Sequence, residues 1–225
     1  MLTGSFTAGP RVMRGALTGD LERAPRSPAV VGEWPVALGL LLLTLVAAPR
    51  SAAAHPHVFV DYGMVIAFAA DGSAHAQFTW TYDEMFSSMI IENLGPRTGR
   101  ELTAADIRAI ERTQFQPLKA GQYFLDIRVD GRPVRVTAVR DFRASLDGDR
   151  VSFVFTVPIP LQNAREGTLE IRVDDPTYFV AFEPRADAPA RWSAPSSYAV
   201  RCKLLPSGGS FEAAAVQCTY KRTGQ

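Results

Sequence analysis

The sequence is poor in cysteine and histidine, and it has neither a strong excess of one charge nor a long apolar run. Its 225 residues include two cysteines and three histidines, with 24 Lys and Arg against 23 Asp and Glu. Two cysteines exclude a four-cysteine zinc site and a disulfide-rich miniprotein. A formal net charge of +1, with basic residues spread along the chain, argues against a nucleic-acid-binding surface. We therefore expect no nucleic-acid partner.

The short signatures of common enzymes are also missing. The sequence contains no G-x-S-x-G elbow, P-loop, G-x-G-x-x-G or H-E-x-x-H. His75 is the one histidine well inside the predicted domain, so a Ser-His-Asp triad has few ways to assemble. The adjacent acids Asp83 and Glu84, and Asp174 and Asp175, are the only support for a secreted hydrolase, and such acids are usually solvated. We expect a protein that is not an enzyme, with an uncharacterised hydrolase as one alternative.

The one apolar run indicates a signal peptide. It covers thirteen uncharged residues, Val36 to Ala48, whereas a bilayer span needs roughly 20. Ala52-Ala53-Ala54 follows, and a short apolar run before an A-x-A site is typical of a secretory signal peptide. We predict a leader over residues 1–54, cleaved after Ala54, with an uncleaved anchor as the alternative. Residues 1–33 show no apolar period and indicate a start codon assigned too far upstream. The mature chain is expected in the periplasm, without a membrane span.

Residues 55–225 are expected to form a single secreted α+β domain. Apolar residues occupy even positions from His57 to Asp83, on both sides of an Asp71-Gly72 turn, which predicts a β-hairpin. Because the apolar residues of both strands have even numbers, even residues must pair with even residues to share one face. The numbers of two paired residues are then expected to add up to about 142 or 144. An insertion at about 84–118 predicts two helices, one over Glu84–Leu94 and one capped by Thr103 and ended by Pro117. The apolar residues of the first helix are expected to pack on the sheet: Met85, Phe86, Met89 and Ile90.

Short strands return after this insertion. The pattern predicts strands at 123–129, 134–146, 151–157, 169–173, 178–182, 198–205 and 211–220. Many short strands with one helical insertion favour a mainly antiparallel, sandwich-like α+β fold. Cys202 and Cys218 flank the last turn, and one structural disulfide is their simplest state in a secreted protein. A thiolate metal site or redox pair is the alternative, although their spacing is not C-x-x-C.

The tripeptide His55-Pro56-His57 is the strongest candidate site. Cleavage after Ala54 would give His55 a free α-amine, so an amine and two imidazoles would lie within three residues. Neutral imidazole is a good ligand for Zn, Ni, Co and Cu. Pro56 has no N–H, which disfavours the square-planar amide chelate and leaves side-chain coordination. Two terminal histidines without a specific role remain the alternative.

The hairpin register indicates which residues join this site. With a sum of 142, Phe59 faces Asp83, and with 144, Asp61 does. Either register places Asp83 near His57 and Asp61, so one of these carboxylates is expected as an oxygen ligand or as a partner to an imidazole. His75 pairs some ten residues further on, roughly 30 Å away, and is expected on the solvent face. Asp175 is a weaker candidate that would approach from another strand.

Three ordered motifs resemble a bacterial secreted family of domains of unknown function. They are His55–Asp61, Trp80–Ser87 and Asp175–Phe182, and the resemblance covers essentially the whole mature chain. Members are similar to periplasmic components of ABC-type transport systems and are found beside nickel/cobalt-type efflux permeases or in zinc-responsive gene sets. The resemblance implies transition-metal handling with an inner-membrane metal permease or ABC-type transporter as partner.

One stretch departs from the pattern of this family. Many members carry an acidic, calcium-loop-like segment between the two helices, whereas residues 93–101 here include Pro96, Arg97 and Arg100. Calcium takes six to eight oxygen ligands, usually several carboxylates, so no calcium site is expected. We therefore expect a periplasmic accessory protein that captures or delivers Ni, Co or Zn through His55 and His57. A metal-independent interaction or regulatory module of a transporter is the alternative. The sequence does not indicate the oligomeric state.

Overall fold

The computed structural model describes residues 57–96, 101–161, 165–187, 190–205 and 214–223. Several sequence predictions lie outside these residues. They are the leader with its cleavage after Ala54, the candidate ligand His55, positions 97–100 of the stretch compared with a calcium loop, and residues 211–213 of the last predicted strand.

The N-terminal hairpin forms as its alternating pattern predicts. β1 (Val58–Phe68) pairs with β2 (Ala74–Tyr82) in antiparallel fashion, with Val60 opposite Tyr82. This is the register with the sum of 142, one of the two that were predicted. The even positions of both strands are buried, because alternate side chains of a strand point to the same face.

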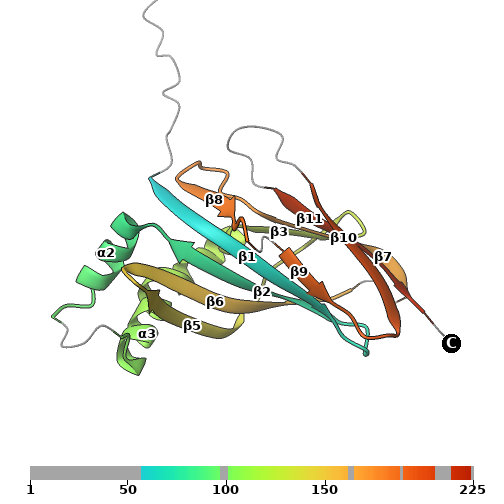
Figure 1. Ribbon diagram of the computed structural model, residues 1–225, viewed down its shortest axis with the longest axis horizontal. Coiled ribbons are helices and arrows are strands. Elements are labelled where there is room, and N and C mark those ends of the chain that lie inside the picture. Colours follow the sequence, from blue (N-terminus) through green and yellow to red (C-terminus); the bar gives the residue numbers. More distant parts are fainter. Residues whose placement is uncertain (1–56, 97–100, 162–164, 188–189, 206–213, 224–225) are drawn as a thin grey trace, which may run out of the picture. The chain divides into compact units, whose positions relative to one another are not determined.

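The hairpin lies within a six-stranded sheet. Its strand order is β5-β6-β2-β1-β8, with β9 also paired to β1. The added strands are β5 (Arg140–Asp147), β6 (Arg150–Ile159), β8 (Val180–Pro184) and β9 (Ala190–Ser193). β8 and β9 run parallel to β1 and pair with successive parts of it, as Figure 1 shows. The four-residue β9 was not predicted, since its pattern is too short to detect.

The second sheet has five strands in the order β10-β11-β7-β3-β4. They are β3 (Leu125–Val129), β4 (Arg132–Val134), β7 (Glu166–Val173), β10 (Tyr198–Leu205) and β11 (Ala215–Arg222). Side chains of both sheets form one core, in which Phe68 of β1 packs on Tyr220 of β11 with ring centroids 5.5 Å apart. The predicted α+β, mainly antiparallel, sandwich-like fold is confirmed.

The helical insertion is longer than predicted. It contains α2 (Glu84–Glu92), α3 (Ala104–Ile110), the π-helical η1 (Glu111–Phe115) and the 3-10 segment η2 (Gln116–Phe124). Thr103 and Asp106 form the predicted capping box. Pro117 does not end the helical region but lies in the first turn of η2, where its missing N–H costs little. Figure 1 shows α2 and α3 beside β5 and β6.

Two predicted strands have different limits in the structure. The segment 134–146 is not one strand, because the chain crosses from β4 in one sheet to β5 in the other through residues 135–139. Val136 continues the apolar pattern because its buried side chain anchors this crossing. The strand predicted from Tyr123 begins at Leu125, since Gln122, Tyr123 and Phe124 all have positive φ. No helix of the described residues is long and apolar enough to cross a membrane.

Candidate functional site

His57 is the first described residue, and it lies immediately before β1. Its backbone N–H donates to the carbonyl oxygen of Phe179 at 2.9 Å, and its ring lies 5.3 Å from the Phe179 ring, centroid to centroid. The His57 side chain is exposed to solvent. The backbone contact fixes where the chain enters the sheet, while the imidazole stays accessible.

Asp83 caps helix α2 and also closes the hairpin. Its Oδ1 accepts from the backbone N–H of Phe86 at 2.8 Å, and its Oδ2 accepts from that of Phe59 at 2.7 Å. The Asp83 N–H in turn donates to the Phe59 carbonyl at 2.9 Å. Asp83 therefore lies opposite Phe59, two residues from His57, as the register of 142 predicts. Each carboxylate oxygen has a further lone pair, so the cap does not exhaust the acceptor capacity of Asp83.

Asp61 is paired with an arginine that the sequence reasoning did not consider. The Arg150 Nη2 lies 2.8 Å from Asp61 Oδ2, and the same guanidinium donates to the carbonyl oxygens of Tyr82 and Thr81. Because the guanidinium is permanently charged, it already balances the Asp61 carboxylate. This contact makes Asp61 a poorer ligand for a cation than Asp83.

Asp175 organises the loop that leads into β8. It is 4% exposed, and its carboxylate accepts four hydrogen bonds. Oδ1 accepts from the N–H and hydroxyl of Thr177, and Oδ2 accepts from the N–H groups of Phe179 and Val180. These donors occupy all of its roughly four acceptor positions. Asp175 therefore fixes the backbone of Phe179. Phe179 in turn accepts the hydrogen bond from His57, so Asp175 acts on His57 indirectly.

His75 lies at the opposite end of the hairpin. It is exposed and pairs with Ala67 of β1, near the turn rather than near the start of the strand. The structure thus confirms the predicted solvent-face position and separates His75 from His57. Among the described residues, no group of three or more His, Cys, Asp and Glu side chains is close enough to hold a metal ion.

Exposed apolar side chains lie at the start of β1, on α2 and in the loop before β8, and the sequence did not predict their exposure. We call this set the strand-start surface, and its members are Phe59 (47% exposed), Met85 (64%), Met89 (51%), Tyr178 (49%) and Phe179 (52%). The prediction that α2 packs on the sheet holds for Phe86 and Ile90 but is wrong for Met85 and Met89. Met85 and Met89 are four positions apart, so they share the face of the helix that Ile90 does not use.

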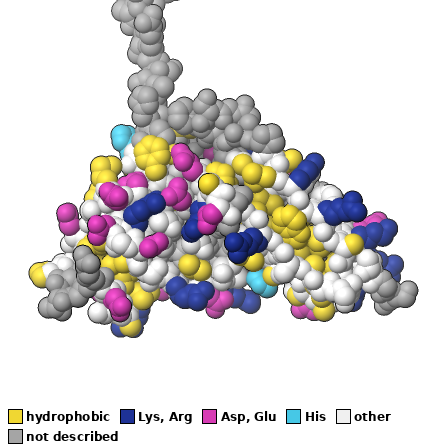
Figure 2. Space-filling view, in the orientation of Figure 1, with side chains coloured by type: hydrophobic (Ala, Val, Ile, Leu, Met, Phe, Trp, Pro, Cys, Tyr) yellow, Lys and Arg dark blue, Asp and Glu magenta, His cyan; other side chains and the backbone are white. Residues whose placement is uncertain are grey.

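A shallow hollow of about 530 Å³ lies on this surface between Phe59, Asp83, Glu84, Met85 and Arg150. Figure 2 shows Asp and Glu side chains over the part of the visible face that carries α2 and the start of β1. Asp61 and Glu183 are paired across β1 and β8, and Asp83 and Glu84 follow the end of β2. Arg150 and Arg185 are the counter-charges to Asp61. This acidic surrounding favours the approach of cations.

The remaining predicted pair is the disulfide. Cys202 and Cys218 are bonded, lie opposite each other on β10 and β11, and are sixteen positions apart in the sequence. The structural disulfide is therefore confirmed, and the alternative of a thiolate metal site does not apply.

Comparisons with known proteins indicate the family but not a function. A crystal structure of AChBP from Bulinus truncatus is similar, with a TM-score of 0.33 and 11% identity, covering 82% of this chain and 98% of that chain. No curated protein matches the sequence. The family model described as "Protein of unknown function (DUF1007)" matches residues 40–206. Because this match covers most of the sequence, the chain belongs to the DUF1007 family of proteins of unknown function.

Proposed function

We propose that this protein is a periplasmic, non-enzymatic accessory protein that binds Zn, Ni or Co for a metal transport system. The ligands are the imidazoles of His55 and His57 and the α-amine that cleavage after Ala54 would create. The observation that carries this proposal is the position of His57. Its backbone is fixed to Phe179 while its side chain is exposed. In the sequence one proline separates it from His55, which lies outside the described residues, so two imidazoles fall within three residues of the chain.

The neighbouring carboxylates support this site to different degrees. Asp83 keeps free lone pairs beside Phe59 and is the best placed to accept from a coordinated imidazole or to bind the metal. Asp61 is less suited because Arg150 already balances it. Asp175 contributes by holding the backbone N–H of Phe179 through one of the four hydrogen bonds that its carboxylate accepts.

The strand-start surface supports the choice of partner. Exposed apolar patches next to a polar site often mark protein interfaces. Phe59 and Phe179 flank His57, so a bound partner would cover the metal ligands. We propose that the partner is the periplasmic side of an inner-membrane permease or ABC-type transporter, to which the metal is handed. The apolar side chains also favour a second candidate function, in which the same surface binds a transporter without any metal.

Metal titration of the secreted, processed protein tests the first function. We expect one Zn, Ni or Co ion per chain, with the N-terminus at His55 verified by sequencing. His57→Ala should weaken affinity by about tenfold or more, because it removes one of the two imidazoles. Asp83→Asn, which keeps an N-cap acceptor, should weaken it less, and His75→Ala should leave it unchanged.

The outcomes separate the two candidate functions. If His75→Ala weakens the metal affinity as much as His57→Ala, the proposed site is wrong. If the processed protein binds no transition metal but co-purifies with a transporter, and if Met85→Ser with Met89→Ser abolishes that association, the metal-independent module replaces the first proposal.

A further inference from the structure

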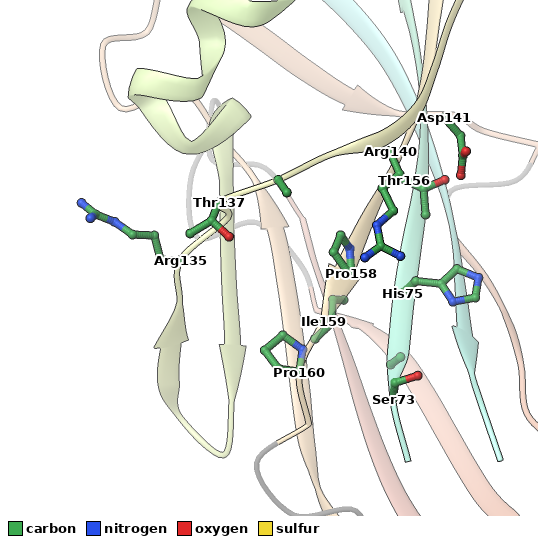
Figure 3. A pocket seen from close by; sticks show the side chains of 12 residues that line it. Ser73, His75, Arg135, Thr137, Arg140, Asp141, Thr156, Pro158, Ile159 and Pro160 are labelled. Atoms are coloured by element: carbon green, nitrogen blue, oxygen red, sulfur yellow. The ribbon is translucent and has the colours of Figure 1, made fainter. Parts of the chain in front are cut away.

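A hollow lined by His75 lies far from the strand-start surface. It has a volume of about 610 Å³, within the range of small-molecule sites. It lies on the outer face of the six-stranded sheet, where β2, β6 and the start of β5 meet the crossing segment 135–139. Its lining residues are Ser73, Ala74, His75, Arg135, Thr137, Ala138, Arg140, Asp141, Thr156, Pro158, Ile159 and Pro160, and Figure 3 shows them.

The cavity has a positive and hydroxylated side. Arg140 lies opposite Thr156 in the β5–β6 pair, and Pro158 lies opposite His75 in the neighbouring β2–β6 pair. In Figure 3 the Arg140 side chain extends toward Pro158, whereas the side chains of Arg135 and Asp141 point away. Among the described residues, the Arg140 guanidinium has neither an ion-pair nor a hydrogen-bond partner. An unpaired guanidinium in a concave site is suited to bidentate binding of a carboxylate or phosphate.

A β-bulge gives Arg140 this position. Arg140 pairs with Thr156, but Arg143 pairs with Val154, so β5 has one residue more than β6 in this interval. Residues three apart in a regular strand would point to opposite faces. The extra residue therefore keeps Arg140 and Arg143 on the same outer face, and Asp141 takes a positive φ of 54° within the bulge. Bulges of this kind commonly direct a side chain toward a site.

The crossing segment 135–139 forms the opposite wall of the cavity and is fixed to the rest of the protein. Val136 is 3% exposed, and its N–H donates to the Oε1 of Gln122 at 2.9 Å. This contact ties the crossing segment to the end of η2 and places Thr137 and Ala138 at the cavity. The base of the cavity is apolar, with Pro158 at the end of β6 and Pro160 just beyond it, whereas the Ile159 side chain between them is buried in the core. Such a base complements a hydrocarbon body.

We propose that this cavity binds a small organic anion, with a carboxylate or phosphate head at Arg140 and an apolar body against Pro158 and Pro160. His75, Thr137 and Thr156 supply further hydrogen bonds to the head or its neighbouring atoms. This site is independent of the proposed metal ligands, because His75 and His57 lie at opposite ends of the hairpin.

Calorimetric titration of the processed protein tests the proposal. The probes are hexanoate and hexyl phosphate, and the controls are hexanol, which lacks the charge, and inorganic phosphate, which lacks the apolar body. We expect saturable binding of at least one of the two charged probes, at least about tenfold tighter than either control. Arg140→Gln should weaken that binding by about tenfold or more, and Arg140→Lys should weaken it less, because lysine keeps the charge without the planar fork.

Arg143→Gln is the matched control, since Arg143 lies on the same strand and face but outside the cavity. It should leave binding unchanged. Equal losses in Arg140→Gln and Arg143→Gln would show only general electrostatic attraction and would overturn the proposal. Absence of saturable binding for both charged probes, or hexanol binding as tight as that of hexanoate, would also overturn it.

Discussion

At the scale of single residues, the candidate carboxylates differ in what already occupies them. Asp83 uses part of its acceptor capacity in a helix cap, Asp61 is paired with Arg150, and Asp175 is saturated by four donors. All three lie in motifs that resemble one family, yet the structure gives each of them a different role. The presence of an aspartate in one of these motifs therefore does not show how well it could bind a metal ion. The hydrogen bonds that its carboxylate already accepts do.

Asp175→Asn should lower the free energy of unfolding by about 2 kcal/mol. The variant places an amide NH₂ group against backbone donors, so at least one buried N–H loses its charge-assisted partner. Urea unfolding with and without added zinc measures the effect, which should be the same in both conditions. Asp149→Asn, at an exposed turn, should change stability by less than about 0.5 kcal/mol. A loss that appears only in the presence of zinc would identify Asp175 as a metal ligand instead.

The sequence predicted the position of a residue correctly where a local pattern, such as the alternation of apolar residues in a hairpin, determines that position. The parity of the hairpin restricted its register to two values, and the structure has one of them. The role of Arg150 could not be predicted, because it depends on how β6 lies against β2, a pairing between distant segments. The exposure of Met85 and Met89 also escaped prediction, because apolar side chains on a helix are normally buried.

At the scale of elements, β10 is held at the edge of its sheet. Among the described strands it pairs with β11 alone, and the disulfide joins the two strands near their middle, between Cys202 and Cys218. Without this bond the edge strand would depend on backbone hydrogen bonds and on a few side chains, such as Tyr198, which is 6% exposed. The disulfide therefore secures an element with few other contacts.

Replacing both cysteines, Cys202→Ala with Cys218→Ala, should lower the free energy of unfolding by about 3 kcal/mol, as expected for a loop of about 15 residues. Hydrogen exchange should locate the change. Amides of β10 should exchange faster, and those of β7 on the other side of β11 should be affected much less. Equal acceleration in β7 and β10 would show that the bond supports the whole sheet rather than its edge.

Elements were predicted well when their patterns were long, and poorly where the chain changes sheets. The hairpin and the capping box of Thr103 follow from local rules. The crossing at residues 135–139 kept an apolar alternation because Val136 is buried between the sheets, so the sequence there is indistinguishable from a continuous strand. Continuation of the helical region past Pro117 was missed because Pro117 lies in the first turn of a new helical segment, η2, a position that proline tolerates.

At the scale of the whole molecule, the core contains tyrosines that are costly to ionise. Burial raises the pKa of Tyr62 to about 12 and that of Tyr220 to about 12, and it also raises the pKa of Tyr82. Tyr62 is 1% exposed, and its hydroxyl donates to the carbonyl oxygen of Ala214 at 3.1 Å. The folded state therefore holds these protons at a pH where the unfolded chain has released them.

The stability of the protein should consequently fall at alkaline pH. The raised pKa values contribute stability that is fully present below the ordinary tyrosine pKa of 10.0 and is lost as the pH rises to about 12. Urea unfolding at several pH values, with tyrosinate absorbance as the second signal, measures the loss. In Tyr62→Phe, part of this pH dependence should disappear. A free energy of unfolding that stays constant across this interval would contradict the assignment of these buried protons.

The parallel pairing of β1 with β8 has a consequence for the order in which the molecule matures. Val58 finds its partner Val180 about 120 residues later in the chain, and contacts between such distant segments form late in folding. During synthesis from the N-terminus, β1 emerges early but waits until about four fifths of the 225 residues have been made. His57 gains its fixed position only when Phe179 arrives, so an incomplete chain would not present this histidine as the finished protein does.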